Sequence, residues 1–295
     1  SLGTRASYNL SSLYPEKGYK VFDNNFYQYL LPALGGKINF SLALGGEHEI
    51  KVESEENIYY LSNCTTLNVS GAIYYLAQDI INSTVSYCFN ITANNLTLDC
   101  QGHLIDGNGS TSYGIYLSRS SSTETNVSVR NCWLTNWRNS GIYLNYANNN
   151  TITNLVINEN ENRGLSLYHS DHNFIRNITA NLNEEGIFIS YSSDYNFLSE
   201  IIANNNSGIA GVGVDILHYS ENNTLTNITA KNNKIGLRIL DSTSNVITNS
   251  YLINNSEYDF YQSGSPDECG NLLQNVTGTD NKPILYLSLI HISEP

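Results

Sequence analysis

An asparagine-initiated motif that returns every 22–31 residues is the feature that most constrains this fold. Typical copies are Asn-Thr-Ile-Thr-Asn at 150–154 and Asn-Phe-Ile-Arg-Asn at 173–177. Each is followed by apolar residues, a polar stretch and a glycine that opens an alternating apolar segment. Such similarity at a nearly fixed period indicates a repeat architecture. The eight copies begin at Asn95, Asn126, Asn150, Asn173, Asn196, Asn223, Asn245 and Asn271.

The pattern within each repeat favours an all-β solenoid. Leucine-rich repeats need a Leu-x-x-Leu-x-Leu frame that is missing, and helical repeats need roughly 33 or more residues. Apolar residues here alternate with polar ones in short runs, which is the period of β-strands. We therefore expect a parallel β-helix in which each aligned asparagine adopts a left-handed turn and bonds its amide to the next asparagine. The glycines are expected at corners that need a positive φ.

Both ends of the chain depart from the repeat. Residues 1–60 are expected to form an N-terminal cap or assembly arm with a β-hairpin over 37–53, although 21–34 could form a short helix. Residues 61–286 are assigned to the β-helix. Residues 287–295 match a translated transposase adapter of sequencing libraries, so we expect an artefact of metagenome assembly, with a genuine strand as the alternative. Because Met is absent, a processed or truncated chain is expected.

The segment from Asn90 to Gly107, with Tyr74-Tyr-Leu-Ala-Gln-Asp-Ile and Cys88-Phe-Asn-Ile before it, is a recognisable opening. It resembles that of right-handed parallel β-helix surface proteins of the pectate-lyase-like superfamily, in archaeal and bacterial members. The resemblance covers about residues 60–286 and implies a right-handed coil with a small non-repeat cap. Because that superfamily holds lyases, hydrolases, adhesins and structural proteins, the resemblance implies little about function.

The charge balance excludes several partners. With 14 Lys and Arg against 27 Asp and Glu, the net charge is -13. No basic face is available for phosphates, so nucleic-acid binding is not expected. Docking on an anionic membrane is disfavoured for the same reason. No apolar run approaches the ~18 residues of a membrane-spanning helix.

Asparagine also occurs in Asn-x-Ser/Thr sequons at about twice the roughly 8 expected by chance. We therefore expect an exported, N-glycosylated protein that is extracellular or at a cell surface. The alternative is that Asn, Ser and Thr simply share turns. The 16 candidate sites are Asn9, Asn39, Asn63, Asn68, Asn82, Asn90, Asn95, Asn108, Asn126, Asn149, Asn177, Asn205, Asn222, Asn227, Asn254 and Asn275.

Five cysteines without CxxC spacing disfavour zinc and suit the disulfides of an exported protein. Cys100 and Cys132 occupy near-equivalent places in adjacent coils, so a disulfide or a reduced buried pair is expected there. Cys64 with Cys88 is a weaker second pair, and Cys88 with Cys100 competes with both. The odd count leaves one thiol free or paired elsewhere.

Candidate catalytic groups are few, and no catalytic residue is assigned. The Asn-Thr-Asp, Gly-His-Gly and Arg-Ile-Lys segments of polygalacturonases are missing. Glu184 and Glu185 are adjacent and should point to opposite faces of a strand. We expect Glu185 to lie beside Arg163 of the previous coil, as a surface ion pair.

No metal or other cofactor is expected, beyond a weak calcium site at Glu159, Glu161 and Glu184. His169, His172 and His218 are expected as exposed turn residues, because two coils place them ~10 Å apart, too far for one metal ion. His103 is expected to be structural. A sugar-stacking face is a further hypothesis, against β-propensity alone, at Tyr74, Tyr75, Tyr113, Tyr116, Tyr143 and Tyr168.

These observations favour a structural or adhesive surface protein that self-associates as a subunit of an extracellular fibre or sheath. The alternative is a polysaccharide-processing lyase or hydrolase, or a carbohydrate-binding module without catalysis. The enzyme reading predicts a groove with two or more carboxylates and a Lys or Arg, to be tested by substituting Glu184 and Asp215.

Overall fold

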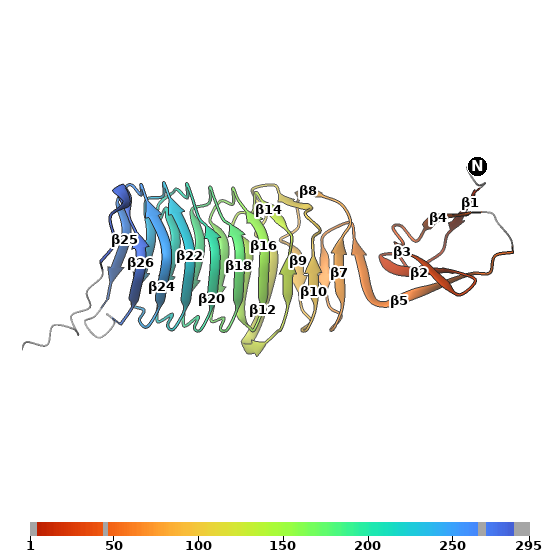
Figure 1. Ribbon diagram of the computed structural model, residues 1–295, viewed down its shortest axis with the longest axis horizontal. Helices are drawn as coiled ribbons and strands as arrows, with labels where there is room; N and C mark the ends of the chain where they lie inside the picture. Colours follow the sequence, from red (N-terminus) through yellow and green to blue (C-terminus); the bar gives the residue numbers. More distant parts are fainter. Residues whose placement is uncertain (1–4, 44–46, 265–269, 286–295) are drawn as a thin grey trace, which may run out of the picture.

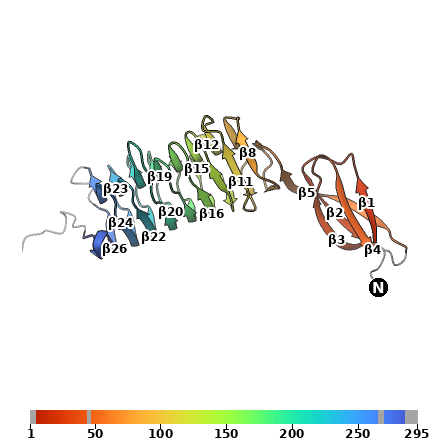
Figure 2. The same cartoon turned by 90° about the horizontal axis from the view of Figure 1, so that it is seen from above.

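The computed structural model describes residues 5–43, 47–264 and 270–285. Strands coil around one long axis into a rod, with a smaller group of strands beyond its N-terminal end (Figure 1). Seen from above, two sheets run along opposite sides of the rod (Figure 2). Neighbouring strands within the rod are parallel and come from successive repeats, so the predicted parallel β-helix is confirmed. The predicted adapter segment, 287–295, lies outside the described residues.

One wall of the rod is a nine-stranded sheet that takes one strand from each coil. Its outermost described strands come from the first and last of these coils. In chain order the strands are β6 (Thr65–Leu67), β9 (Tyr87–Ile91), β12 (Tyr113–Glu124), β15 (Ser140–Asn148), β17 (Arg163–Tyr168), β19 (Glu185–Ser190), β21 (Val212–Leu217), β23 (Ile235–Leu240) and β25 (Tyr258–Ser263).

The facing wall belongs to a fifteen-stranded sheet. Its solenoid strands are β7 (Ile73–Leu76), β10 (Thr97–Asp99), β13 (Ser128–Arg130), β16 (Thr151–Ile157), β18 (Phe174–Thr179), β20 (Phe197–Ile202), β22 (Thr224–Lys231), β24 (Val246–Ile253) and β26 (Leu272–Thr277). A side branch holds β8 (Ile80–Ser83), β11 (Leu104–Gly107) and β14 (Trp133–Thr135), and a 3-10 turn, η2 (Thr279–Asn281), follows β26.

The N-terminal strands pair differently from the prediction. β1 (Arg5–Leu10) pairs with β4 (Ile38–Ala43), and β2 (Lys17–Asp23) forms a hairpin with β3 (Phe26–Pro32). Thus the predicted hairpin over 37–53 is wrong, since β5 (Ile50–Leu61) pairs with β2 instead of β4.

The helix considered over 21–34 is also wrong. Asn24 and Asn25 both have positive φ, which suits the tight turn of a hairpin rather than a helix. Strand β5 joins the two parts of the molecule. It runs antiparallel to β2 along 50–54 and parallel to β7 along 58–61.

The core of the rod forms because inward side chains of both walls are aliphatic. On β15, Ile142 and Leu144 are buried in this core while Tyr143 between them is half-buried on the outside. This alternation is the two-residue period of a strand with one buried face. A separate small core, including Val21, Ile38 and Phe40, holds the N-terminal strands together.

Buried asparagines link successive coils at one corner. The side-chain Nδ2 of Asn150 donates to Oδ1 of Asn173 over 2.9 Å, and that oxygen also accepts the backbone N–H of Asn150. The same pair of bonds repeats upward to Asn271. The predicted amide-to-amide bonding is therefore confirmed. We call Asn150, Asn173, Asn196, Asn223, Asn245 and Asn271 the first asparagine ladder.

A second asparagine ladder at another corner escaped the sequence analysis. It starts from Asn160, whose Nδ2 donates to Oδ1 of Asn183 over 3.0 Å. The polar stretches that contain its members differ in length and in the residues around each asparagine, so the sequence alone does not align these asparagines. The ladder comprises Asn160, Asn183, Asn206, Asn233 and Asn255.

The predicted left-handed turn lies one residue before the first ladder. Asn149, His172 and Tyr195 have φ values of 60°, 56° and 54°, whereas the ladder asparagines that follow them do not have positive φ. The register pairs Ser128 with Thr151, so Asn126 aligns with Asn149 and not with Asn150. The alignment of the two earliest repeats by Asn95 and Asn126 is therefore wrong by one residue.

The corner glycines serve a different purpose from the one predicted. Gly164, Gly186 and Gly213 do not have positive φ. A Cβ on Gly186 would lie 2.6 Å from the carbonyl oxygen of Gly213 in the next coil. These positions need glycine because successive backbones approach too closely for any side chain.

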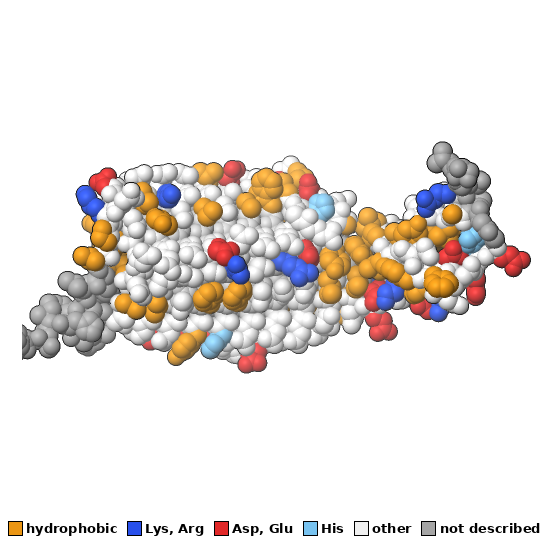
Figure 3. Space-filling view, viewed as in Figure 1, with side chains coloured by type: hydrophobic (Ala, Val, Ile, Leu, Met, Phe, Trp, Pro, Cys, Tyr) orange, Lys and Arg blue, Asp and Glu red, His pale blue; other side chains and the backbone are white. Residues whose placement is uncertain are grey.

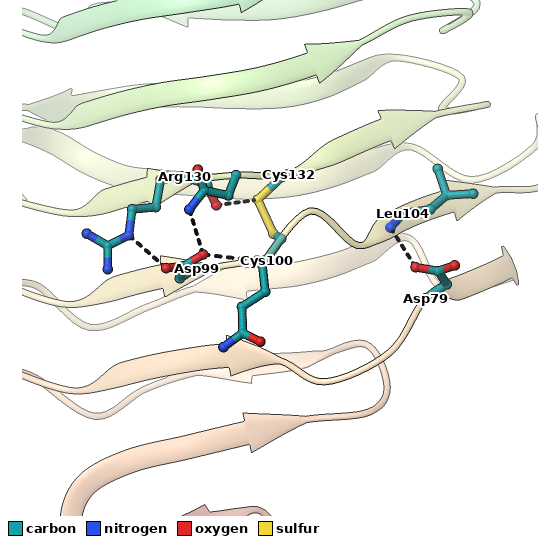
Figure 4. Close-up of a disulfide and its surroundings, with 8 residues drawn as sticks. Asp79, Asp99, Cys100, Leu104, Arg130 and Cys132 are labelled. Atoms are coloured by element: carbon teal, nitrogen blue, oxygen red, sulfur yellow. Dashed lines mark hydrogen bonds and ion pairs between the residues drawn. A yellow bond between two sulfur atoms is a disulfide. The ribbon is translucent and has the colours of Figure 1, made fainter. Parts of the chain in front are cut away.

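Two disulfides connect the first coils. Cys64 is bonded to Cys88 and Cys100 to Cys132, with Cα separations of 4.3 and 4.8 Å. Figure 4 shows the second bond beside an ion pair in which Arg130 Nε donates to Asp99 over 2.9 Å. The competing pairing of Cys88 with Cys100 is not formed. The fifth cysteine lies outside the described residues.

Candidate functional site

The outer surface of the nine-stranded sheet collects most of the chemically distinctive side chains. Parallel pairing places residues of successive coils directly in register, so like positions form rows along the rod. One row contains Tyr116, Tyr143, Phe188, Asp215 and Arg238. We call the outward side chains of β9 to β25 the aromatic–ionic face. Its rows are Tyr87, Tyr113, Ser140, Arg163, Glu185, Val212, Ile235 and Tyr258; Asn90, Tyr116, Tyr143, Ser166, Phe188, Asp215, Arg238 and Tyr261; and Ser118, Asn145, Tyr168, Ser190, Leu217, Leu240 and Ser263.

Tyrosine rings cover the N-terminal half of this face. Tyr116 and Tyr143 stack with ring centroids 5.5 Å apart and planes 6° from parallel. Tyr113 lies 5.0 Å from Tyr143, and Tyr143 lies 5.3 Å from Tyr168. Burial raises the pKa of Tyr113, Tyr143 and Tyr168, so these phenols stay protonated and uncharged at neutral pH. The rings form a continuous uncharged platform.

The sequence hypothesis of a tyrosine face is only partly matched by this geometry. The structure brings Tyr113, Tyr116, Tyr143 and Tyr168 together. Tyr74 and Tyr75 lie on β7 in the other sheet, where Tyr74 is buried and stacks on Tyr59. The sequence analysis missed Tyr87 and Phe188. Both occupy positions that are in register with residues of the face in the neighbouring coils, so they can be assigned to it once the register is known.

An ionic cluster follows the tyrosines toward the C-terminal coils. Nε of Arg163 donates to Oε2 of Glu185 over 2.6 Å. Arg238 donates two bonds to the carboxylate of Asp215, over 2.8 and 2.6 Å, and its Nη2 lies 3.6 Å from Glu185. The expected pairing of Glu185 with Arg163 is confirmed, but it is not a surface ion pair because Glu185 is only 4% exposed.

Burial changes the acidity of this cluster. Removal from water raises the pKa of Glu185 to about 7, against the opposing effect of the positive charge of Arg163. The negative charge of the neighbouring Asp215 carboxylate contributes to this rise in the pKa of Glu185. Near neutral pH, the carboxyl of Glu185 is therefore partly protonated. The guanidinium of Arg163 lies over the ring of Phe188, 3.7 Å from its centroid.

Aromatic side chains also line one edge of the face. Tyr146, His169, Tyr191 and His218 follow one another in successive coils, and each has positive φ. His169 lies 4.4 Å from Tyr146 and 5.7 Å from Tyr191, and His218 lies 4.7 Å from Tyr191. The two histidines are thus separated by a tyrosine ring, as their two-coil spacing predicts. His172 stacks separately on Tyr195.

A hollow of about 480 Å³ lies at the C-terminal end of the face. Its wall includes Tyr258 and Tyr261 from β25, with Arg238 and Lys234 beside them. The rim contains Ile209, which is 91% exposed and whose carbonyl accepts a bond from Lys234 Nζ over 3.1 Å. This rim is built by four residues inserted into one repeat, since the first ladder advances 27 residues from Asn196 to Asn223 and 23 from Asn173 to Asn196.

The weaker candidate sites do not assemble. Glu159, Glu161 and Glu184 line one shallow depression, but the described part of the chain contains no group of three His, Cys, Asp or Glu that could hold a metal ion. Glu184 instead accepts the backbone N–H of Ala210 over 3.0 Å. His103 lies against Asp79 at 2.9 Å.

All 16 sequon asparagines lie in described residues, and none is buried. Thirteen are exposed, and the half-buried three are Asn90, Asn149 and Asn222. By contrast, none of the ten buried asparagines in the described residues begins a sequon. From β12 to β25, no strand of the nine-stranded sheet carries one, so the potential glycans would surround most of the aromatic–ionic face without covering it.

The opposite side of the molecule offers a different surface (Figure 3). Hydrophobic side chains gather where β5 connects the N-terminal strands with the rod, and charged side chains stand in small groups. In the fifteen-stranded sheet, Arg176 on β18 pairs with Glu200 on β20 at 2.7 Å. Among the described residues, no helix is long and apolar enough to span a membrane.

Comparisons with known proteins identify the fold. The solved structures that resemble the chain include the enzymatically active domain of tailspike protein 2 of bacteriophage CBA120, at 13% identity and a TM-score of 0.54. That match covers 75% of this chain and 37% of the tailspike chain. The A-module of mannuronan C-5 epimerase AlgE4 from Azotobacter vinelandii is 14% identical over 77% of this chain and 76% of its own, with a TM-score of 0.43.

Pectate lyase Pel9A is 14% identical over 56% of this chain and 47% of that chain, with a TM-score of 0.46. This chain therefore spans about a third to a half of the tailspike and lyase chains. A search of curated proteins found no match. The family described as "Right handed beta helix region" matches residues 50–216, more than half of the 295 residues. The chain therefore belongs to the right-handed β-helix family.

Proposed function

We propose that this protein binds a polysaccharide chain along its aromatic–ionic face. The observation that carries the proposal is the run of rings from Tyr87 through Tyr113, Tyr116, Tyr143 and Tyr168, which continues to Phe188. Aromatic rings offer large apolar contact area with a polar hydroxyl at one end. An extended row of such groups along a rigid sheet suits a linear polymer with apolar ring faces and many hydroxyls.

Two further features support this face as the ligand-binding surface. It is built on strands rather than loops, so its side chains are held at a fixed spacing of about 4.8 Å from coil to coil. The sequons of the later coils also avoid it. If the protein is exported and glycosylated, as its surface sequons and two disulfides suggest, the face would stay open.

The proposal is tested by affinity electrophoresis against a panel of soluble polysaccharides. The variants Tyr116→Ala and Tyr143→Ala should each weaken binding about 2- to 10-fold, because each ring contact is worth about 0.5–1.5 kcal/mol. The matched control is Tyr251→Ala, since Tyr251 is 51% exposed on β24 in the other sheet. Equal loss in the control, or no polymer bound by the unaltered protein, would refute the proposal.

Processing of the same polymer is a second candidate. Glu185 has a carboxyl that is partly protonated near pH 7 and lies beside the carboxylate of Asp215. Glycosidases typically use one carboxylic acid that donates a proton and a second carboxylate near it. Product release from a bound polymer, abolished by Glu185→Gln with binding retained, would support this candidate. Binding without product would favour an adhesive role, whereas self-association into a fibre stays a prediction for sedimentation to test.

A further inference from the structure

We infer that the polysaccharide bound by the aromatic–ionic face is uncharged, and not a polyuronate or a sulfated polymer. This inference rests on the proposed function and adds the chemical class of its ligand. It follows from how the charged groups on the face are already paired, from the charge of the whole chain, and from the neutral groups that remain free to meet a ligand.

The charges on the face neutralise one another. Its three rows contain four ionisable acid or guanidinium groups, namely Arg163, Glu185, Asp215 and Arg238. Above about pH 7, where Glu185 is ionised, the two positive and two negative charges of the face sum to zero. The whole chain, these four groups included, carries 14 positive and 27 negative side chains, a net charge of -13, which repels a polyanion.

Both arginines are already bound to carboxylates of the face. Arg163 donates from Nε to Glu185 over 2.6 Å and from Nη1 to the hydroxyl of Tyr168 over 2.8 Å. Arg238 is engaged by both oxygens of Asp215, whose side chain is fully buried. A sugar carboxylate that captured either guanidinium would leave a buried carboxylate without its partner, which is strongly unfavourable.

The charged groups of the hollow at the end of the face are paired as well. Lys234 at its rim lies 3.5 Å from the carboxylate of Glu257, which also lines the hollow. Its ammonium donates to the carbonyl of Ile209 as well. The pair adds one charge of each sign, so the hollow presents Tyr258 and Tyr261 without a free cation beside them.

The groups of the face that can hydrogen-bond to a ligand are uncharged. Beside the rings lie the half-buried Ser118 and Asn145, whose hydroxyl and amide groups can both donate and accept hydrogen bonds. Asn145 Nδ2 already donates to Ser118 Oγ over 3.0 Å, which orients both groups. Sugar hydroxyls, which also donate and accept, match these groups and the tyrosine phenols without moving any charge.

The experiment compares neutral glucans, mannans and xylans with polygalacturonate and alginate, by calorimetry at low and at physiological salt. The expected result is binding to at least one neutral polymer, less than about 2-fold change in Kd between the two salts, and no polyanion binding. Tight polyanion binding that weakens with salt would overturn the inference but leave the proposed function standing. If no polymer of either class binds, the proposed function itself fails.

A gain-of-binding variant gives an independent test. Asp215→Asn releases Arg238 and should create binding of polygalacturonate that the unaltered protein lacks, by at least about 3-fold over background. The matched control is Glu200→Gln, which makes the same change in net charge and releases Arg176 on the opposite sheet. Equal gain in the two variants would show that net charge alone excludes anions and would overturn the assignment to this face. Should Asp215→Asn fail to fold, Glu185→Gln releases Arg163 in its place.

Discussion

Arg163 and Glu185 face each other across one coil boundary, with Nε of the arginine 2.6 Å from Oε2 of the glutamate. The pair is in register because each residue directly precedes a corner glycine in its own repeat. Although it lies on the outside of a sheet, the glutamate is almost fully buried, with Arg163 and Arg238 both within ion-pair distance of its carboxylate. A charged pair in such surroundings makes stability depend on pH.

Stability should fall as pH rises through the range set by Glu185. Its folded-state pKa of about 7 lies above the ordinary value of 4.5, so between these values the folded protein binds the proton more tightly than the unfolded chain. The folded state then gains stability at the lower pH and loses it as pH approaches and passes 7. Thermal unfolding between about pH 5 and pH 8 checks the sign, and Glu185→Gln should flatten this part of the profile.

The control for that experiment is Glu200→Gln. Its hydrogen bond to Arg176 lowers the pKa of Glu200, so the removal of this carboxyl cannot flatten a loss of stability between pH 5 and pH 8. A profile of Glu185→Gln that is parallel to that of the unaltered protein would contradict the role of Glu185.

Interruption of the first asparagine ladder should be costly. In Asn196→Ala, the backbone and side-chain N–H groups of Asn173 lose their acceptor, and Oδ1 of Asn223 loses a donor. Each buried group left without a partner costs about 1–3 kcal/mol. Urea unfolding measures the loss, against Asn63→Ala at an exposed position in an early coil. Similar stabilities for the two variants would show that the ladder contributes little.

The corner glycines should not tolerate a methyl group. In Gly186→Ala, the new Cβ would lie 2.6 Å from the Gly213 carbonyl oxygen and 3.0 Å from that of Ala180, so two coils must move apart. Overpacking of this kind costs about 1–3 kcal/mol. Hydrogen exchange should increase in the coils that flank residue 186 more than at distant ones, because each coil contacts only its neighbours. Uniform exchange would contradict this local strain.

Glycan occupancy should follow exposure. In a host that N-glycosylates exported proteins, peptide mass mapping should find glycans at exposed sequons such as Asn177 on β18 and Asn227 on β22. Occupancy should be lower at half-buried Asn90, Asn149 and Asn222. Unmodified exposed sites in such a host would favour the alternative that these residues only form turns.

Much of the architecture follows from sequence because each repeat must satisfy the same contacts. The first ladder can be predicted because every member is followed, two residues later, by Ile or Leu, and Asn150 and Asn173 do bond. The register of the two earliest repeats was not visible, since Leu96 and Val127 occupy the ladder position and the nearby Asn95 and Asn126 take the left-handed turn before it.

The site was harder to predict than the fold. Arg163 and Glu185 share a local signal, the glycine after each, and were paired correctly. Asp215 and Arg238 share only their distance from the glycines of their own coils, so their bidentate pair appears once the register is known. The burial of Glu185 could not be predicted, because it depends on how side chains from neighbouring coils, Arg163 and Arg238 among them, pack against it.

The first asparagine ladder has a consequence for how this protein could change in size. The members from Asn173 to Asn245 make the same pair of bonds to the coil on either side, so duplication of one inner repeat would insert another identical link. The aromatic–ionic face would lengthen by about 4.8 Å with each added coil. If the face binds a polymer as proposed, the length of polymer that it contacts could therefore be set by gene duplication.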